Sequence, residues 1–297
     1  MRSGFVTIVG RPNVGKSTLL NRLVGQKVAI VAPKPQTTRN RILAIKNTPE
    51  AQIVFFDTPG IHKPRYEMDR LMLESAIQSL RRVDVVLLVI DMTHAFGGPR
   101  GDDEKHVLKL VKEVDVPVIL GINKIDTRTK PEILPVIDAY RVKHDFAEIV
   151  PFSALEGDNV DRLEEVLARY LPEGERLYPE ETLTDLPERF FVSEMVREKI
   201  LRLTRHEIPH STAVLVDAWE EGEELVRIEA SIIVDRDSQK AILVGRGGSM
   251  LKKIGTAARM DAEHFLGSKV FLGLHVKVRG AWRENKRLLT ELGIDPH

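Results

Sequence analysis

The sequence predicts two domains of different construction: an α/β doubly wound domain over residues 1–172 and a smaller α+β domain over residues 189–297. Three observations support this division. Short apolar runs alternate with amphipathic stretches as far as residue 170. Prolines and acidic residues then crowd into 173–188, and beyond them the strands show alternating apolar side chains. The 297 residues are enough for each domain to bury its own core.

The first domain contains five apolar runs that we expect to form buried strands, at residues 6–9, 53–56, 85–90, 118–122 and 149–152. Uninterrupted runs of this kind suit a parallel sheet that helices cover on both faces. Helices are expected in the intervals between them. One face of the last helix is shared by four residues, Val160, Leu163, Leu167 and Tyr170. Such strand–helix alternation is typical of the doubly wound class.

Residues 173–188 are interpreted as a linker, because prolines interrupt any regular pattern there. From Pro172 to Glu188 one basic residue stands among six acidic residues, which gives a local charge of −5. The composition of this segment does not settle whether the linker is rigid.

The second domain is expected to open with an amphipathic helix that contains Val192, Met195, Val196, Ile200 and Leu203. Two strands follow, at residues 213–219 and 225–234, and the second shows strict alternation of apolar and polar side chains. After a short helix and a glycine-rich corner come another helix and a last strand at residues 270–278. The order α-β-β-α-α-β defines a small α+β domain.

The composition excludes several classes of site. The chain has no cysteine, which rules out disulfides, iron–sulfur clusters, thiolate zinc sites and cysteine nucleophiles, and fits a reducing cytosol. It has no signal-peptide pattern at its start, and no apolar run approaches the ~20 residues of a membrane-spanning helix. We therefore expect a cytoplasmic monomer, for which any contact with the inner face of the plasma membrane would be peripheral.

The strongest motif is G-x-x-x-x-G-K-[ST], which lies at residues 10–17 between the first strand and the first helix. Its glycines let backbone N–H groups surround a phosphate, and the helix N-terminus adds partial positive charge. Lys16 is expected to reach the β- and γ-phosphates, and the Ser17 hydroxyl to bind Mg²⁺. The residues assigned to nucleotide binding here are Gly10, Arg11, Pro12, Asn13, Val14, Gly15, Lys16, Ser17 and Thr18.

A second motif, N-K-I-D at residues 123–126, follows a later strand and identifies the base. The Asp126 carboxylate can accept two N–H bonds from guanine, and adenine has no such pair to offer. Asn123 can bond N7 of the guanine, while the stem of Lys124 can lie along the ring. The guanine O6 is expected to meet backbone N–H groups after the next strand, in Ser153, Ala154 and Leu155. The expected ligand is therefore GTP or GDP.

Two further segments are expected to sense the third phosphate. The D-T-P-G motif of Asp57, Thr58, Pro59 and Gly60 closes a strand, so that Asp57 can hold Mg²⁺ through water and the Gly60 N–H can meet the γ-phosphate. Between the first helix and that strand lies Q-T-T-R at residues 36–39. A threonine there can bind Mg²⁺ only when the triphosphate is present, which makes a switch.

Of the two threonines in Q-T-T-R, we prefer Thr38 to Thr37 as the metal ligand. The expected Mg²⁺ ligands are therefore Ser17, Thr38 and Asp57.

These motifs resemble the five G-motifs of the translation-factor-related GTPases, and the forms GRPNVGKS, QTTR and DTPG resemble the Era branch. The resemblance implies slow, Mg²⁺-dependent hydrolysis of GTP to GDP and phosphate. The residues expected to support catalysis are Lys16, Thr38, Asp57 and Gly60, and no general base is assigned among them.

Activation of the attacking water is the least determined part of this site. Ras-like GTPases carry a glutamine directly after the D-x-x-G glycine, and this chain has Ile61 there, which has no hydrogen-bonding side-chain atom. Three routes stay open: positioning of water by substrate and backbone, an arginine from a partner, or a cation. The resemblance extends a K⁺-binding role to Asn13, with shaping of the loop as the equal alternative.

The second domain carries G-x-x-G at residues 245–248, between two expected helices. In a KH domain this loop lets a nucleic-acid backbone approach two helix ends closely. Residues 236–287 hold 12 Lys and Arg against 4 Asp and Glu, a local charge of +8. The residues expected to contact RNA are Gly245, Arg246, Gly247, Gly248, Lys252 and Lys253. A basic extension of this surface, or else a solvated helix face, is expected from Lys277, Arg279, Arg283, Lys286 and Arg287.

An α/β P-loop GTPase domain followed by an α+β type II KH domain is the arrangement of the Era family, and the resemblance covers nearly all of the chain. It implies binding to the 3′ region of 16S rRNA and a role in assembly of the 30S ribosomal subunit. An RNA-binding regulator with incidental hydrolysis stays open as an alternative. A tRNA-modifying GTPase is disfavoured, because the chain has no catalytic cysteine.

One other motif is weighed and rejected. H-E-x-x-H at residues 206–210 binds zinc only if both histidines lie on one face of a helix. Pro209 would break such a helix, so we expect a loop without metal here.

Overall fold

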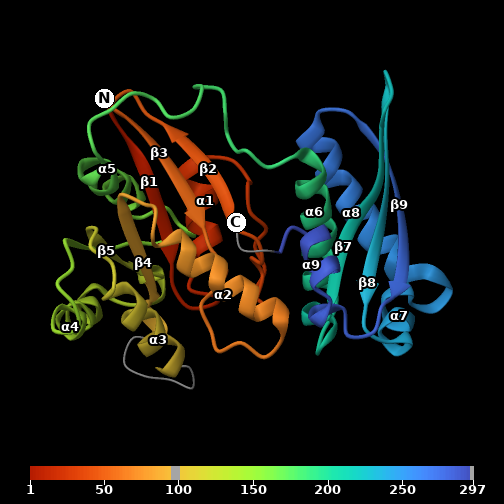
Figure 1. Cartoon of the computed structure of the whole chain (residues 1–297), viewed down its shortest axis with the longest axis horizontal. Coiled ribbons are helices and arrows are strands. Elements are labelled where there is room, and N and C mark those ends of the chain that lie inside the picture. The colour runs from red at the N-terminus through yellow and green to blue at the C-terminus, as the bar shows by residue number, and fades with distance from the viewer. Residues whose placement is uncertain (95–100, 295–297) are drawn as a thin grey trace.

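The computed structural model describes residues 1–94 and 101–294, which form two domains that lie side by side (Figure 1). Within these residues the first domain is built on a six-stranded sheet with the order β2-β3-β1-β4-β5-β6. Neighbouring strands are parallel except for β2, which is antiparallel to β3. The strands are β1 (Arg2–Val9), β2 (Ile42–Asn47), β3 (Ala51–Asp57), β4 (Val85–Asp91), β5 (Val118–Asn123) and β6 (Glu148–Pro151).

Helices cover both faces of this sheet, as the apolar runs predict. On one face, Leu20 of α1 and Leu163 of α5 pack into a core with β1 and β3. On the other face, Ala76 of α2, Val107 of α3 and Val136 of α4 pack against β4 and β5. The doubly wound class is confirmed. The helices are α1 (Lys16–Val24), α2 (Glu67–Ser79), α3 (Gly101–Val111), α4 (Lys130–Arg141) and α5 (Val160–Tyr170).

The antiparallel strand β2 is absent from the strands that the sequence predicts. It forms a hairpin with β3, in which the Thr48 N–H donates to the carbonyl of Ala51 at 2.8 Å. Its sequence, ILAIKN, is a short apolar run with a polar end, and nothing local distinguishes it from the loop before it. The strand exists because the edge of β3 is available for pairing, which is a long-range condition.

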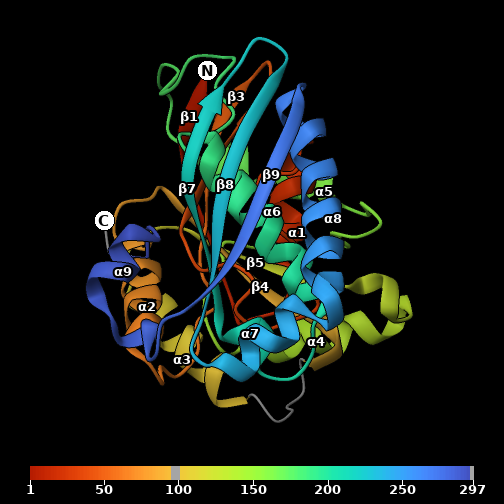
Figure 2. The ribbon, with the colours of Figure 1, turned by 90° about the vertical axis from the view of Figure 1, so that its right-hand side faces the viewer.

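The second domain has a three-stranded sheet, with β7 antiparallel to β8 and β8 parallel to β9. Helices α6, α7 and α8 pack on one face of it through Ile200, Leu243 and Ile254. Figure 2 shows the three strands in front of α6, so α6 lies between this sheet and the first domain. The elements are α6 (Glu188–Leu203), β7 (Thr212–Glu221), β8 (Leu225–Val234), α7 (Asp237–Val244), α8 (Ser249–Leu266) and β9 (Lys269–Val278). The predicted order α-β-β-α-α-β is confirmed.

The chain continues past β9 into a short helical segment, Trp282–Glu284, and helix α9 (Lys286–Glu291), neither of which the sequence predicts. Trp282 is fully buried and shares a core with Leu288 and Leu289 of α9. The same core contains Met68 and Met72 of α2 in the first domain. The C-terminal segment therefore joins the two domains through apolar packing.

The segment between α5 and α6 is the expected linker, and it is fixed along the first sheet. The fully buried Gln52 of β3 accepts from the backbone N–H groups of Leu177 and Tyr178, at 2.7 and 2.9 Å. Further along, the N–H of Ile45 donates to the carbonyl of Leu183 at 2.8 Å. The backbone of the linker is thus hydrogen-bonded to β3 and β2 at two places, so the linker acts as a strap and not as a free tether. Within the described ranges, no helix has the length and apolarity to cross a membrane.

Candidate functional site

The G-x-x-x-x-G-K-S loop connects β1 to α1 at the carboxyl end of the parallel strands, where open α/β sheets bind ligands. It borders a cavity of about 460 Å³, which is large enough for a nucleotide. The lining includes six residues of the loop and the helix start, Pro12, Asn13, Gly15, Lys16, Ser17 and Thr18. It also includes Thr38, Gly60 and Lys124 from three of the other motifs, so the chain brings the predicted residues to one place.

The loop is shaped for close approach to a ligand. Gly15 has φ 99°, and a Cβ there would lie 2.2 Å from the Asn123 amide, so only glycine fits. Lys16 is buried, and its Nζ donates to the carbonyls of Gly10 at 3.0 Å and Arg11 at 3.1 Å. Burial lowers the pKa of Lys16 to about 8, although Asp57 raises it in part. A phosphate at this position would favour the charged form.

Not every residue of the motif faces the cavity. The Arg11 side chain turns towards α3 and forms an ion pair with Glu104 at 3.5 Å. Val14 is 2% exposed and belongs to the core. Thr58 is buried and donates its hydroxyl proton to the carbonyl of Ile8 at 2.8 Å. Such residues can serve a nucleotide through backbone groups or by shaping the loop.

The three predicted Mg²⁺ ligands meet in one cluster. Ser17 Oγ lies 2.7 Å from Thr38 Oγ1 and donates to Asp57 Oδ2 at 2.7 Å. Thr38 Oγ1 donates to the same carboxylate oxygen at 3.3 Å. Thr37 also borders the cavity, but its hydroxyl is engaged away from this cluster, where it donates to the carbonyls of Ala32 and Lys34. The geometry thus favours Thr38 over Thr37.

The residues of this cluster fit a small, hard cation. Asp57 is fully buried, and its Oδ1 has no hydrogen-bond partner among the described residues. Burial raises the pKa of Asp57, while Lys16 and the two hydroxyl groups lower it in part. Mg²⁺ takes oxygen ligands, usually one or two carboxylates with phosphate and water, and would satisfy that orphan oxygen.

The turn after Asp57 comes very close to the P-loop. A Cβ on Gly60 would lie 2.8 Å from backbone atoms of Pro12, so this position also requires glycine. Ile61 donates its N–H to the carbonyl of Gly10 at 3.3 Å, and its side chain is 1% exposed in the core. Ile61 therefore points away from the cavity, in agreement with the absence of a glutamine-like role.

The base-recognition motifs are tied to each other and to the P-loop. Asn123 donates to the carbonyl of Val14 at 2.8 Å and accepts from the N–H of Ala154 at 2.9 Å. Asp126 is exposed and is oriented by the Ser153 hydroxyl at 2.5 Å. Leu155 is 66% exposed next to it. Asn123 thus acts as a junction of three loops, and Asp126 is left available to a base.

Lys124 has contacts that the motif alone does not indicate. Its Nζ donates to the carbonyl of Asn13 at 2.9 Å and to Asp91 Oδ2 at 2.6 Å. Asp91 ends β4 in the way that Asp57 ends β3, and this strand-end position is the signal that could have identified it. Lys124 therefore bridges the base motif and the P-loop.

The G-x-x-G loop lies where the sequence predicts it, between the end of α7 and the start of α8. Gly245, Gly247 and Gly248 have φ values of 70°, 60° and 80°, which glycine adopts without strain. A Cβ on Gly247 or Gly248 would meet nothing within 4 Å, so the outside of the loop is open. Three exposed basic residues flank it, Arg246, Lys252 and Lys253.

Comparisons with known proteins agree on both domains. The family model described as a 50S ribosome-binding GTPase matches residues 5–124, and the KH domain model matches residues 207–283. GTPase Era of Geobacter metallireducens is 50% identical over 294 residues, which cover 98% of this chain and 97% of that protein. The chain belongs to the Era family of GTPases.

Two crystal structures of Era proteins share the complete fold. A variant of Era from Aquifex aeolicus bound to GDP and AlF₄⁻ matches with a TM-score of 0.94 at 46% identity, over 99% of this chain and 100% of that chain. Era in complex with MgGDPNP and nucleotides 1506–1542 of 16S ribosomal RNA matches with a TM-score of 0.95 at 46% identity, over 99% of each chain. This Era-family chain is therefore a GTPase joined to a KH domain.

The KH domain of this Era-family chain contacts the first switch segment, which we define as residues 31–40. Arg197 of α6 donates to the carbonyl oxygens of Gln36, at 3.5 Å, and Thr37. Its neighbour Glu198 is fully buried and accepts from the Val31 N–H at 3.2 Å. Arg202, which also lines the nucleotide cavity, donates to the Val31 carbonyl at 3.0 Å. Sequence reasoning assigned α6 only an amphipathic packing role and missed this contact.

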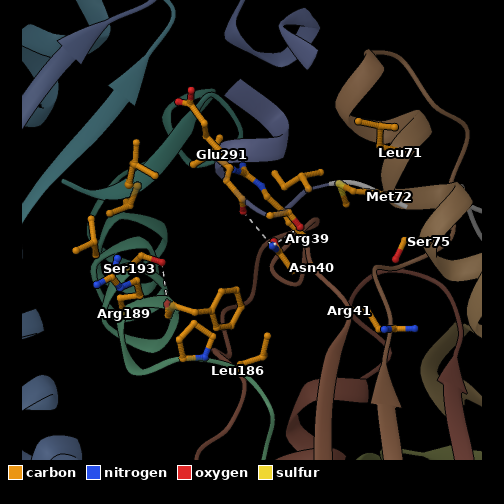
Figure 3. A pocket seen from close by; sticks show the side chains of 18 of the residues that line it. Arg39, Asn40, Arg41, Leu71, Met72, Ser75, Leu186, Arg189, Ser193 and Glu291 are labelled. Carbon is orange, nitrogen blue, oxygen red and sulfur yellow. Dashed lines mark hydrogen bonds between the residues drawn. The ribbon is translucent and has the colours of Figure 1, made fainter. Parts of the chain in front are cut away.

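The residues after Thr38 continue the domain interface. Arg39 is 3% exposed and donates to the carbonyl of Thr212 in β7 at 2.6 Å. Beside it lies a cavity of about 360 Å³ between the two domains, lined by Arg189 and Ser193 of α6 on one side and by Arg39 and Asn40 on another (Figure 3). Asn40 spans the interface, because its amide donates to the carbonyl of Gly293 at 2.9 Å.

The basic extension expected after β9 is largely used within the protein. Arg283 forms an ion pair with Asp235 at 2.8 Å and lies over the Tyr66 ring at 3.9 Å. Lys286 pairs with Glu67 of α2 at 3.5 Å. Arg283 and Lys286 therefore contact the GTPase domain, through Tyr66 and Glu67.

The H-E-x-x-H segment adopts the expected irregular structure. Its second half is a single short helical turn at Ile208–His210, with Pro209 buried, and its first histidine has φ 57°. No cluster of three potential metal-binding side chains occurs in the parts of the chain that the structure covers. The prediction of a loop is confirmed.

Proposed function

We propose that this GTPase is a guanine-nucleotide switch that binds the 3′ region of 16S rRNA through its KH domain and assists maturation of the 30S subunit. One observation carries the proposal: a protein with this complete fold is known in complex with MgGDPNP and nucleotides 1506–1542 of 16S rRNA. We place the activity in the cytoplasm, with the protein acting as a monomer. Any contact with the inner face of the plasma membrane would be peripheral.

In this proposal the triphosphate lies along the P-loop. Lys16 neutralises the β- and γ-phosphates, and the Gly60 N–H meets the γ-phosphate. Mg²⁺ supplies charge stabilisation between the β- and γ-phosphates, held by Ser17, Thr38 and, through water, by Asp57. The side-chain oxygens of these three residues lie within 3.3 Å of one another, which supports their assignment as metal ligands.

The guanine base would occupy the other end of the cavity. The exposed Asp126 accepts the two N–H groups of guanine, and the fixed orientation that Ser153 gives it supports this role. The stem of Lys124 covers one face of the ring. Of the N–H groups expected to meet O6, those of Ser153 and Ala154 already donate to the Asp158 carbonyl and the Asn123 side chain, at 2.9 Å each, so the N–H of Leu155 is assigned to O6. Adenine would leave the Asp126 carboxylate, covered by the base, without the two N–H donors that guanine offers, which costs about 1–3 kcal/mol or more for a charged group.

The RNA would lie across the G-x-x-G loop at the junction of α7 and α8. The open space outside Gly247 and Gly248 supports close approach of the backbone, and Arg246, Lys252 and Lys253 supply charge for its phosphates. The nucleotide state would reach this domain through α6, because Arg197 holds the carbonyls of the residues that lead into Thr38.

Multiple-turnover hydrolysis by the whole chain tests the proposal. Phosphate release from GTP should rise when 30S subunits, or an RNA with the 3′ sequence of 16S rRNA, are added. The alternative, an RNA-binding regulator with incidental hydrolysis, has one observation in its favour: the buried Ile61 cannot orient water. That alternative predicts RNA binding with no change in turnover, and this result would overturn the proposed role.

A further inference from the structure

A cluster of hydrogen-bonded side chains joins the two switch segments, and the motifs do not account for it. We define the second switch segment as residues 57–66. Its His62 is 17% exposed and faces the first switch segment. His62 also borders a cleft of about 1300 Å³ that runs from Pro12 of the P-loop to the KH domain.

His62 fixes the backbone of the turn that carries Gly60. Its Nδ1 lies 2.8 Å from the carbonyl oxygen of Gly60, and this nitrogen carries the ring proton because a carbonyl can only accept. The N–H of the same peptide, on Ile61, donates to the carbonyl of Gly10 at 3.3 Å. The Gly60–Ile61 peptide is therefore held at both its oxygen and its nitrogen.

The other ring nitrogen reaches the first switch segment. His62 Nε2 lies 3.0 Å from Gln36 Nε2, and it accepts from this amide because the ring proton is on Nδ1. The same amide nitrogen donates to Asp69 Oδ1 at 2.9 Å. Asp69 is 1% exposed, and its second oxygen accepts from the backbone N–H groups of Arg65 and Tyr66. The cluster is therefore anchored at the start of α2.

Gln36 is the link between the two segments. Its φ of 60° lies in the left-handed region, which residues other than glycine rarely adopt. Such a conformation persists only where the surroundings determine it, and it is often associated with function. Gln36 stands two residues before Thr38 and borders both the nucleotide cavity and the large cleft. The cluster thus connects the Thr38 backbone to the Gly60 turn.

We propose that His62 and Gln36 are positioning residues for GTP hydrolysis, which lock the two switch segments together around the terminal phosphate. The proposal rests on the nucleotide placement given above. During hydrolysis a water oxygen bonds to the γ-phosphorus, the bond from that phosphorus to the β–γ bridging oxygen breaks, and both protons of the water leave with inorganic phosphate as H₂PO₄⁻. We assign His62 no proton transfer to or from the reacting water, because both ring nitrogens are engaged: Nδ1 by the Gly60 carbonyl, and Nε2 by the Gln36 amide with Asp69 Oδ1 3.7 Å away. Its role is to keep the Gly60 N–H and Thr38 where the reacting groups need them.

Single-turnover hydrolysis of GTP by the full chain tests the role of the ring. We expect His62→Ala to lower the rate about tenfold, because small displacements of positioning groups have large effects on rate. Its affinity for GDP should stay within about twofold of the wild type, because GDP lacks the phosphate that the cluster surrounds. His62→Asn keeps an N–H for the Gly60 carbonyl and should hydrolyse GTP at least about threefold faster than His62→Ala.

A double-mutant cycle tests whether the two side chains act as a unit. Gln36→Ala should slow hydrolysis as much as His62→Ala, and the double variant should be no slower than either. His106→Ala, at an exposed histidine of α3, is the control and should match the wild type. The proposal is overturned by a wild-type rate in His62→Ala, by multiplicative losses in the double variant, or by an equal loss of GDP affinity. Failure of the proposed function would look different, because the wild-type chain itself would then not bind or hydrolyse GTP.

Discussion

Replacing Arg197 with alanine should uncouple RNA binding from the bound nucleotide. Arg197 belongs to α6 of the KH domain, and its side chain is 3% exposed. Its guanidinium donates to the carbonyls of Gln36 and Thr37, while two bonds of 2.6 Å to Glu194 hold it in place. Thr38, which follows Thr37 in the chain, is the proposed Mg²⁺ ligand when GTP is bound. A nucleotide exchange that moves Thr38 therefore acts directly on α6.

The expected change in the ratio of RNA affinities between the two nucleotide states follows from these contacts. A hydrogen bond to a charged group contributes about 1.5–3 kcal/mol. The bond to Gln36 is at the 3.5 Å limit, so only the bond to Thr37 counts in full. A loss of about 2 kcal/mol corresponds to a factor of about 30 in an equilibrium constant, within the range of typical coupling energies. The ratio of RNA affinities in the GTP and GDP states should therefore fall towards one.

Fluorescence anisotropy with a labelled RNA of the 16S 3′ sequence measures this ratio, in GDPNP and in GDP. Arg205→Ala is the matched control, because Arg205 is an exposed arginine just beyond the end of the same helix. Coupling is reciprocal, so RNA should also lose its effect on nucleotide affinity in Arg197→Ala. If Arg197→Ala binds RNA and keeps the wild-type ratio of RNA affinities between GDPNP and GDP, the reasoning is refuted.

Three further predictions concern the nucleotide site. Asp126→Asn should move nucleotide preference from guanosine to xanthosine, since the amide offers a donor to the xanthine oxygen; unchanged selectivity in a binding competition would exclude the base assignment. Thr38→Ala should raise the Mg²⁺ concentration needed for GTP binding about tenfold, or ~1.4 kcal/mol, whereas Thr37→Ala should not; equal effects in a Mg²⁺ titration would contradict the ligand set. If Asn13 holds a K⁺ ion, hydrolysis should be faster in K⁺ than in Na⁺ at equal ionic strength, and equal rates would leave Asn13 only the shaping of the loop.

The parts of the site that the sequence predicts are those governed by local rules. A P-loop needs a strand before it and a helix after it, and both are recognisable from residues 5–24 alone. Asp57 and Asn123 end buried strands, and the carboxyl ends of parallel strands meet at one edge of the sheet. Their convergence on one cavity could therefore be inferred before any coordinates were known.

The elements and contacts that the sequence does not predict depend on residues far away in the chain. β2 forms only because β3 offers an edge, and α9 forms only because Trp282 finds an apolar surface on α2. From the sequence alone, Arg197 is one charged residue on the polar side of an amphipathic helix. Its burial against the first switch segment follows from the way the domains pack, for which no local pattern exists.

His62 and Gln36 illustrate the same limit at the site itself. Gln36 opens the Q-T-T-R motif and His62 lies two residues after Gly60, but neither motif assigns a role to these two side chains. Their contact joins residues 26 positions apart and requires the left-handed backbone at Gln36. A hydrogen-bond network of this kind is visible only once the fold has brought the two segments together.

Crosslinking of the chain to total cellular RNA, followed by sequencing, tests the central claim most directly. The experiment is run once with GDPNP and once with GDP. The account predicts reads concentrated at the 3′ region of 16S rRNA, enriched by at least about fivefold in one of the two nucleotide states. Reads spread over RNA without preference, or equal in both states, would contradict it.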